Sequence, residues 1–114
     1  MQLKVRACLE DVRLAAELIL RFTANKSLSD YENDVLLRSA VERQFEIIGE
    51  AINRMRRVDP NIIDSLPQSL RIIAFRNILI HGYDVVENTI VWEVMQNNLS
   101  PLLRHVQGLL STQE

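Results

Sequence analysis

Four residues that could do chemistry together lie close to one another in an otherwise apolar part of the chain. Arg76, Asn77, His81 and Tyr83 fall within one segment of eight residues, 76–83, which overlaps the apolar stretch 70–80. An imidazole is suited to proton transfer near neutral pH. A guanidinium offers a planar fork of donors that fits phosphate oxygens. The combination is suited to cleavage of RNA without a metal ion.

Each of these residue types has a natural role in that reaction. His81 would remove the proton from a ribose 2′-hydroxyl or protonate the leaving 5′-oxygen. Arg76 would stabilise the charge that builds up around phosphorus. Asn77, one helical turn before His81, would orient its imidazole or bind a phosphate oxygen. Arg76 and His81 are therefore the candidate catalytic pair and Asn77 is a supporting residue.

The segment predicts two different faces if it is helical. At about 100° per residue, Arg76 and Tyr83 nearly eclipse each other, and Asn77 and His81 lie about 100° and 140° away. This polar face also contains Ile73 and Ile80. The opposite, apolar face is expected to hold Ile72, Phe75, Ile78 and Leu79.

A single copy of this set is incomplete, because the reaction needs both an acid and a base and only one histidine is supplied. We expect Ile73 and Ile80 to pack across a twofold axis, which would bring a second Arg76 and His81 into a shared cleft. The alternative is that Arg76 and His81 are structural, since ion-pair networks are common in proteins.

The preceding helical stretch offers features that bear on that alternative. Glu42, Glu46 and Glu50 recur every four residues, and such like-charged neighbours repel one another, so cationic partners are expected. Gly49 lies in the middle of the same stretch and costs up to about 1 kcal/mol relative to Ala. We expect it to allow the close approach of another helix.

Apolar spacing predicts an all-α protein, an antiparallel bundle of four main helices with no strands. A capping box at Ser29 and Glu32 should open the second helix, Pro67 should lie in the first turn of the third, and Pro101 should kink the last. The four helices are expected at about Gln2–Thr23, Ser29–Val58, Pro67–Gly82 and Thr89–Leu110.

Composition limits the class of protein. The 114 residues, of which 47% are hydrophobic and 25% charged, are expected to form one helical domain spanning residues 1–114. A net charge of −2 excludes a globally basic nucleic-acid binder. With a lone Cys8, no signal-like N-terminus and no apolar run of about 18 residues, we expect a cytoplasmic protein without a membrane partner. His105 has no spaced ligand partner, so neither metal nor cofactor is expected.

The order of several motifs resembles the HEPN superfamily and, within it, the HepT-type toxins. The resemblance runs from about Val41 to Leu103. It rests on Arg76-x4-His81 with Asn77 and Tyr83, on Ile48-Gly49-Glu50-Ala51, on Val91-Trp92-Glu93 and on Asn98-Leu99-x-Pro101-Leu102.

The resemblance implies a fold, an activity and a regulator. HepT-like proteins are all-α homodimers and act as ribonuclease toxins, with Arg76 and His81 matching the catalytic pair. Their antitoxin, MntA, is a minimal nucleotidyltransferase that adds AMP units to the tyrosine matching Tyr83. Phosphates placed on Tyr83 would sit beside Arg76 and repel an RNA backbone.

Two other functions remain open at this point. The chain could be a non-catalytic nucleotide- or partner-binding subunit of a minimal nucleotidyltransferase, with Arg76 holding a nucleotide phosphate. It could also be a dimeric scaffold in which Arg76 and His81 only stabilise the fold. Loss of RNA cleavage on replacing His81 would favour the ribonuclease over both.

Overall fold

The computed structural model describes residues 1–81 and 87–111, and of these all side chains except those of residues 80 and 81. Every regular element in this part of the chain is helical, so the predicted all-α class is confirmed. The elements are α1 (Leu3–Thr23), α2 (Leu28–Glu32), α3 (Val35–Val58), the 3₁₀ helix η1 (Pro60–Ser65), α4 (Ser69–His81), α5 (Asn88–Val94), the π-helical turn η2 (Met95–Leu99) and α6 (Ser100–Ser111).

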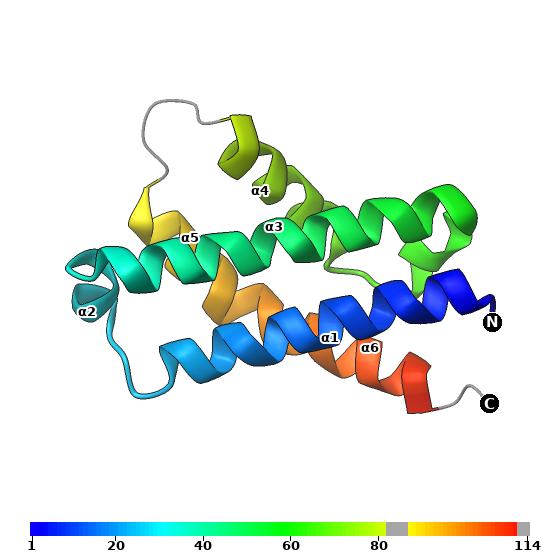
Figure 1. Cartoon of the computed structure of the whole chain (residues 1–114), viewed down its shortest axis with the longest axis horizontal. Coiled ribbons are helices and arrows are strands. Elements are labelled where there is room, and N and C mark those ends of the chain that lie inside the picture. Colours follow the sequence, from blue (N-terminus) through cyan, green and yellow to red (C-terminus); the bar gives the residue numbers. More distant parts are fainter. Residues whose placement is uncertain (82–86, 112–114) are drawn as a thin grey trace.

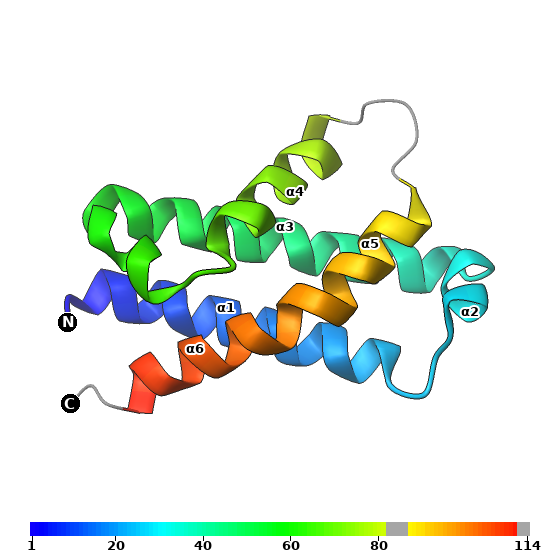
Figure 2. The ribbon, with the colours of Figure 1, turned by 180° about the vertical axis from the view of Figure 1, so that it is seen from behind.

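The two longest helices form the base on which the others are placed. α1 and α3 lie side by side and run in opposite directions (Figure 1). On one face of this pair, α5, η2 and α6 follow one another as a single rod, which crosses in front of both helices in Figure 2. α4 starts beside the C-terminal half of α3 and leans away from it, so that the His81 end of α4 projects from the body of the molecule.

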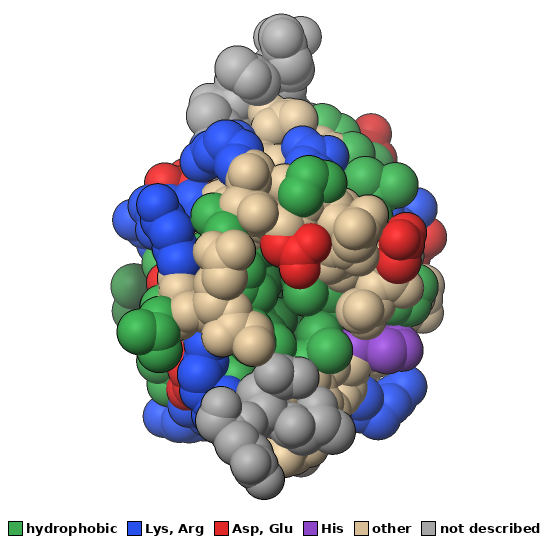
Figure 3. Space-filling view, turned by 90° about the vertical axis from the view of Figure 1, so that its right-hand side faces the viewer, with side chains coloured by type: hydrophobic (Ala, Val, Ile, Leu, Met, Phe, Trp, Pro, Cys, Tyr) green, Lys and Arg blue, Asp and Glu red, His purple; other side chains and the backbone are tan. Residues whose placement is uncertain are grey.

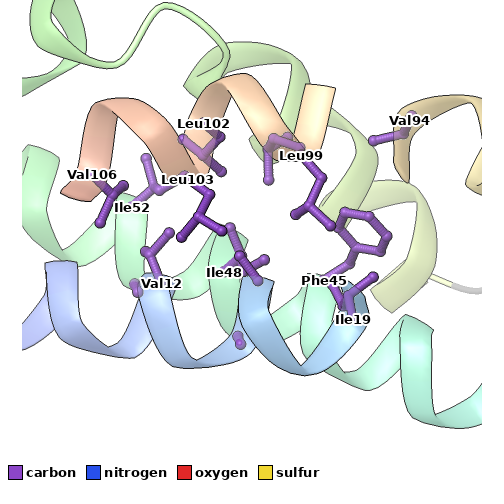
Figure 4. Close-up of a cluster of buried hydrophobic side chains, with 14 of the residues drawn as sticks. Val12, Ile19, Phe45, Ile48, Ile52, Val94, Leu99, Leu102, Leu103 and Val106 are labelled. Atoms are coloured by element: carbon purple, nitrogen blue, oxygen red, sulfur yellow. The ribbon is translucent and has the colours of Figure 1, made fainter. Parts of the chain in front are cut away.

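The core forms where apolar stripes of α1, α3 and the C-terminal rod meet (Figure 4). Burial of such side chains stabilises the fold by about 1.5–3 kcal/mol each. Phe45 of α3 and Phe75 of α4 meet edge to face, with ring centroids 5.1 Å apart, which fixes α4 against α3. Core residues that are less than 2% exposed include Val12 and Ile19 of α1, Phe45, Ile48 and Ile52 of α3, and Leu99, Leu102 and Val106 of the rod.

The prediction of one helix from Ser29 to Val58 is wrong in its first part, where the chain forms two separate helices, α2 and α3. The capping box lies two residues earlier, where the Ser27 hydroxyl accepts from the amide of Asp30 and the Asp30 carboxylate accepts from the amide of Ser27. Asp34 then caps α3 by accepting from the amide of Leu37 at 3.1 Å. A side-chain cap at each start explains why α2 and α3 are separate.

The prolines act as helix boundaries in ways that the sequence predicts only in part. α4 begins at Ser69, two residues after Pro67, so the prediction that Pro67 lies in the first turn of this helix is wrong. Ahead of Pro101 the chain forms the π-helical turn η2. A proline has no amide to donate, and a local change of helical register accommodates that loss.

Candidate active site

Arg76 lies in the middle of the buried face of α4. Ile72 is 0% exposed, Ile73 7% and Phe75 3%, and all three lie within about 100° of Arg76 around the helix axis. Ile78, expected on the apolar face, is instead 45% exposed. The predicted division of faces is therefore wrong. Apolar residues occur on nearly every side of α4, so apolar spacing alone could not define which side is buried.

Gly49 of α3 makes room for Arg76. A Cβ atom added at Gly49 would lie 2.6 Å from Cγ of Arg76 and closer still to its Cβ. Gly49 is buried, and no side chain larger than hydrogen fits at that point without a shift of α4 or of Arg76. The expected close approach at Gly49 is confirmed, and the residue that approaches is the candidate catalytic arginine.

The guanidinium of Arg76 makes few hydrogen bonds with the described residues. Its Nη1 donates to Oδ1 of Asn77 at 3.3 Å, while its Nε is buried and has no hydrogen-bond partner among the described residues. A buried donor without a partner costs about 1–3 kcal/mol and calls for a functional or structural explanation. In this structure Asn77 orients Arg76, a role that the sequence had not suggested for it.

The glutamates of α3 do not hold Arg76 in place. Glu46 lies 3.8 Å from Arg43, and Glu50 lies 2.8 Å from Arg54, so both pair with cations of their own helix. Glu42, the third glutamate, has no ion pair among the described residues. Burial is the main cause that raises the pKa of its carboxyl.

Among the described residues, no carboxylate lies within ion-pair distance of Arg76. The alternative in which these glutamates anchor Arg76 is not supported. The Arg76 guanidinium retains donors for an oxyanion.

The other predicted site residues are only partly described. His81 is the last residue of α4, five positions after Arg76, which places it about 7.5 Å further along the helix axis and about 140° around it. The side chains of Ile80 and His81, and the whole of Tyr83, lie outside the described residues. Their roles remain predictions. Ile73, expected at a dimer interface, lies in the core of its own protomer.

A polar cluster that the sequence analysis missed fixes the start of α4. Asn98 of η2 is 9% exposed. Its Oδ1 accepts from Nε of Arg71 at 3.0 Å, and its Nδ2 donates to Oε1 of Gln68. Asn98 belongs to a motif that the sequence analysis singled out, but its partners lie 27 and 30 residues away. Only the packing of the rod beside α4 reveals the connection.

The described part of the chain offers no other centre of chemistry. It holds no group of three metal-binding side chains, and none of its helices has the length and apolarity needed to cross a membrane. His105 is exposed, with its Nδ1 2.7 Å from the carbonyl oxygen of Pro101. Cys8 is buried in the core, where burial, and then the nearby Asp11, raise the pKa of its thiol.

Comparison with known proteins places the chain in a family. It is 30% identical over 107 residues to an RNase candidate of Methanocaldococcus jannaschii, and the aligned region covers 90% of this chain and 94% of that protein. It is 33% identical over 98 residues to a ribonuclease HepT candidate of Thermococcus cleftensis, covering 82% and 84%. An RNase candidate of Caldanaerobacter subterraneus is 28% identical over 109 residues, covering 96% of each chain.

No solved structure matches the chain. The model of one family, described as ribonuclease HepT-like, matches residues 12–109. This match takes in α3, α4 and the C-terminal rod, and with them Gly49, Arg76 and Asn98. The chain belongs to the ribonuclease HepT-like family.

Proposed function

We propose that the protein is a metal-independent endoribonuclease toxin whose active site is Arg76 and His81. The observation that carries this proposal is the state of Arg76. Its side chain passes over Gly49 and its guanidinium has no carboxylate partner among the described residues. A structural arginine in a helical core would be expected to have such a partner. The names of the relatives, which are those of ribonucleases, agree with this function.

The reaction follows from these two side chains. The ribose 2′-oxygen attacks the adjacent phosphorus, the new bond from the 2′-oxygen to phosphorus forms, and the bond to the 5′-oxygen breaks. One imidazole takes the proton of the 2′-hydroxyl and a second gives a proton to the leaving 5′-oxygen. Arg76 donates to the non-bridging oxygens, where charge develops in the transition state. The products are a 2′,3′-cyclic phosphate and a free 5′-hydroxyl.

The site is completed by a second copy of the chain. Arg76 and His81 of one protomer are separated by about 140° around α4, and one protomer supplies one imidazole where the reaction uses two. Ile78 is 45% exposed and borders a hollow of about 230 Å³ between α4 and α5 that Phe75 and Ile90 also line. We place the twofold contact on this face of α4, with Ile78 in it, and His81 lies about 60° from Ile78 around the helix axis.

Regulation acts at Tyr83 in this proposal. A partner nucleotidyltransferase of the MntA type adds AMP units to Tyr83, two positions after the end of α4. The added phosphates bind the available donors of Arg76 and repel the RNA backbone. The toxin is active when Tyr83 is unmodified.

Cleavage of a labelled RNA in the presence of a metal chelator tests the proposal. His81→Ala and Arg76→Ala should each lower kcat/KM by at least about 100-fold, as expected for loss of an acid–base group or of an electrostatic contact. Asn97→Ala, at an exposed position of η2, is the matched control and should retain activity. If the wild-type chain cleaves no RNA while Arg76→Ala loses nucleotide binding, the protein is instead a nucleotide-binding subunit.

A further inference from the structure

A cationic hollow lies where α1 begins and α3 ends. Its volume is about 360 Å³, and it is lined by Lys4, Arg54, Arg57 and Val58. Figure 3 looks at this end of the molecule and shows Lys and Arg side chains gathered along its left-hand side. No carboxylate is part of the described lining. The hollow therefore presents positive charge to the solvent.

The three cations are close together but not equally available. Arg54 pairs with Glu50 at 2.8 Å, whereas the described structure shows no ion pair for Lys4 or Arg57, and both are exposed. All three line the same hollow, which places them near one another. Lys4 and Arg57 thus form a pair of cations without an ion-pair partner among the described residues.

Helix stabilisation accounts for only one member of this pair. Arg57 lies in the last turn of α3 and complements the negative end of that helix. Lys4 is the second residue of α1, at the positive end, and the first turn of α1 contains no acidic residue. A cation there is unfavourable by about 0.3–1 kcal/mol and is also repelled by Arg57. Departures from a local rule of this kind are expected at functional sites.

We propose that this hollow binds phosphates of the RNA backbone, as a contact separate from Arg76. The proposal rests on the proposed ribonuclease function. Among the described residues, the lining offers no aromatic ring on which a base could stack and no side-chain amide that could recognise a base edge. Its charges suit phosphate groups regardless of sequence. The hollow thus contributes affinity and positioning but not base preference.

The distance along α3 fits a single RNA strand. Arg57 lies eight residues beyond Gly49, over which Arg76 passes. Eight residues correspond to about 12 Å of helix, or three to four stacked nucleotides at about 3.4 Å each. The hollow is therefore out of reach of a very short substrate bound at Arg76 and within reach of a longer one.

The test compares two double variants that remove the same charge. Lys4→Gln/Arg57→Gln removes the pair in the hollow, and Lys26→Gln/Arg104→Gln removes two exposed cations elsewhere that have no ion pair in the described structure. Both are made in a His81→Ala background, and their binding to labelled RNA is measured by fluorescence anisotropy over a range of salt concentrations.

With an RNA of about 15 nucleotides, the hollow variant should bind about tenfold more weakly than the control variant. Its slope of log K against log salt should be shallower by about 1.4, which is about 0.7 for each single-strand phosphate that the variant no longer binds. With an RNA of about three nucleotides, the two variants should bind alike. Equal affinities of the two variants for the longer RNA overturn the proposal.

Two further measurements separate the possible failures. In the chain with His81 intact, the hollow variant should raise KM for the longer RNA and leave kcat unchanged. If the wild type cleaves no RNA, the proposed function fails, yet the binding comparison still decides whether the hollow holds RNA. If the hollow binds inorganic phosphate while RNA affinity is unaffected by its loss, the assignment to an RNA backbone is wrong.

Discussion

Gly49 and Arg76 form the residue contact on which the candidate site depends. Gly49→Ala adds a methyl group where Cγ of Arg76 would lie 2.6 Å away. Such overpacking costs about 1–3 kcal/mol, which outweighs the gain of up to about 1 kcal/mol in helix propensity. We expect a lower Tm by thermal unfolding, and RNA cleavage reduced toward that of Arg76→Ala because the guanidinium is displaced.

Gly108→Ala is the matched control for that variant. Gly108 also lies within a helix, α6, but a Cβ atom added there meets nothing within 4 Å. This variant should gain up to about 1 kcal/mol in free energy of unfolding and keep its activity. If Gly49→Ala is stabilised as much as Gly108→Ala, then Gly49 is not the reason that Arg76 can lie where it does.

Glu42 should make stability depend on pH in a definite direction. Burial raises the pKa of its carboxyl, the neighbouring Glu46 raises it further, and Arg38 partly offsets both. The folded protein therefore favours the protonated form. The protonated Glu42 carboxyl contributes its full share of the folding free energy below its pKa in the unfolded chain. This contribution is lost as the pH rises through its pKa in the folded protein. Glu42→Gln should raise the Tm at about pH 7, with a difference that shrinks toward about pH 4.

Asp30 provides a comparison of opposite sign. The backbone amide and the hydroxyl of Ser27 hold the pKa of the Asp30 carboxyl below its usual range, so its stabilisation is present at neutral pH and lost as the pH falls through the folded pKa. Asp30→Asn should lower the Tm at about pH 7 and have little effect in acid. Equal shifts of the two variants at every pH would contradict the assignment of these carboxyls.

At the scale of the elements, the start of α4 is fixed by its contact with η2. Asn98→Ala removes the acceptor of Arg71 and the donor to Gln68, and we expect a loss of about 1–3 kcal/mol in free energy of unfolding. Hydrogen exchange of the α4 amides should quicken more than that of α1. Asn97→Ala, at the exposed neighbouring position, should change neither. If both variants behave alike, the polar cluster does not hold α4.

At the scale of the whole molecule, the exposed apolar face of α4 predicts the assembly. Ile78→Asp should shift the protein to monomers in sedimentation equilibrium, without loss of helicity, and should abolish RNA cleavage because the second Arg76 and His81 are removed. Ile73→Asp is unsuitable for this purpose, since Ile73 is 7% exposed and lies in the core. Leu14→Asp, at a 50% exposed position of α1, is the control. A monomeric, fully active Ile78→Asp would show that one copy is sufficient.

The sequence by itself determined the helical class, most helix ends and the close approach at Gly49. Helix ends follow from local signals, such as Val58 before Asp59 and Pro60, which act within a few residues. The buried stripes of α1 and α3 follow from apolar residues three and four apart. The residue types Arg76 and His81, at their spacing on one helix, were sufficient to suggest the chemistry.

Only the tertiary structure decided how α4 is oriented and what Arg76 contacts. In α4 the apolar residues occur on nearly every side and give no periodic signal that selects one face. The buried side was therefore set by Gly49 and Phe45 of α3, more than 20 residues away in the chain. The absence of a carboxylate beside Arg76 among the described residues and the tie from Asn98 to the start of α4 have the same origin. They depend on which helices pack together, and packing between distant segments is not a property of local sequence.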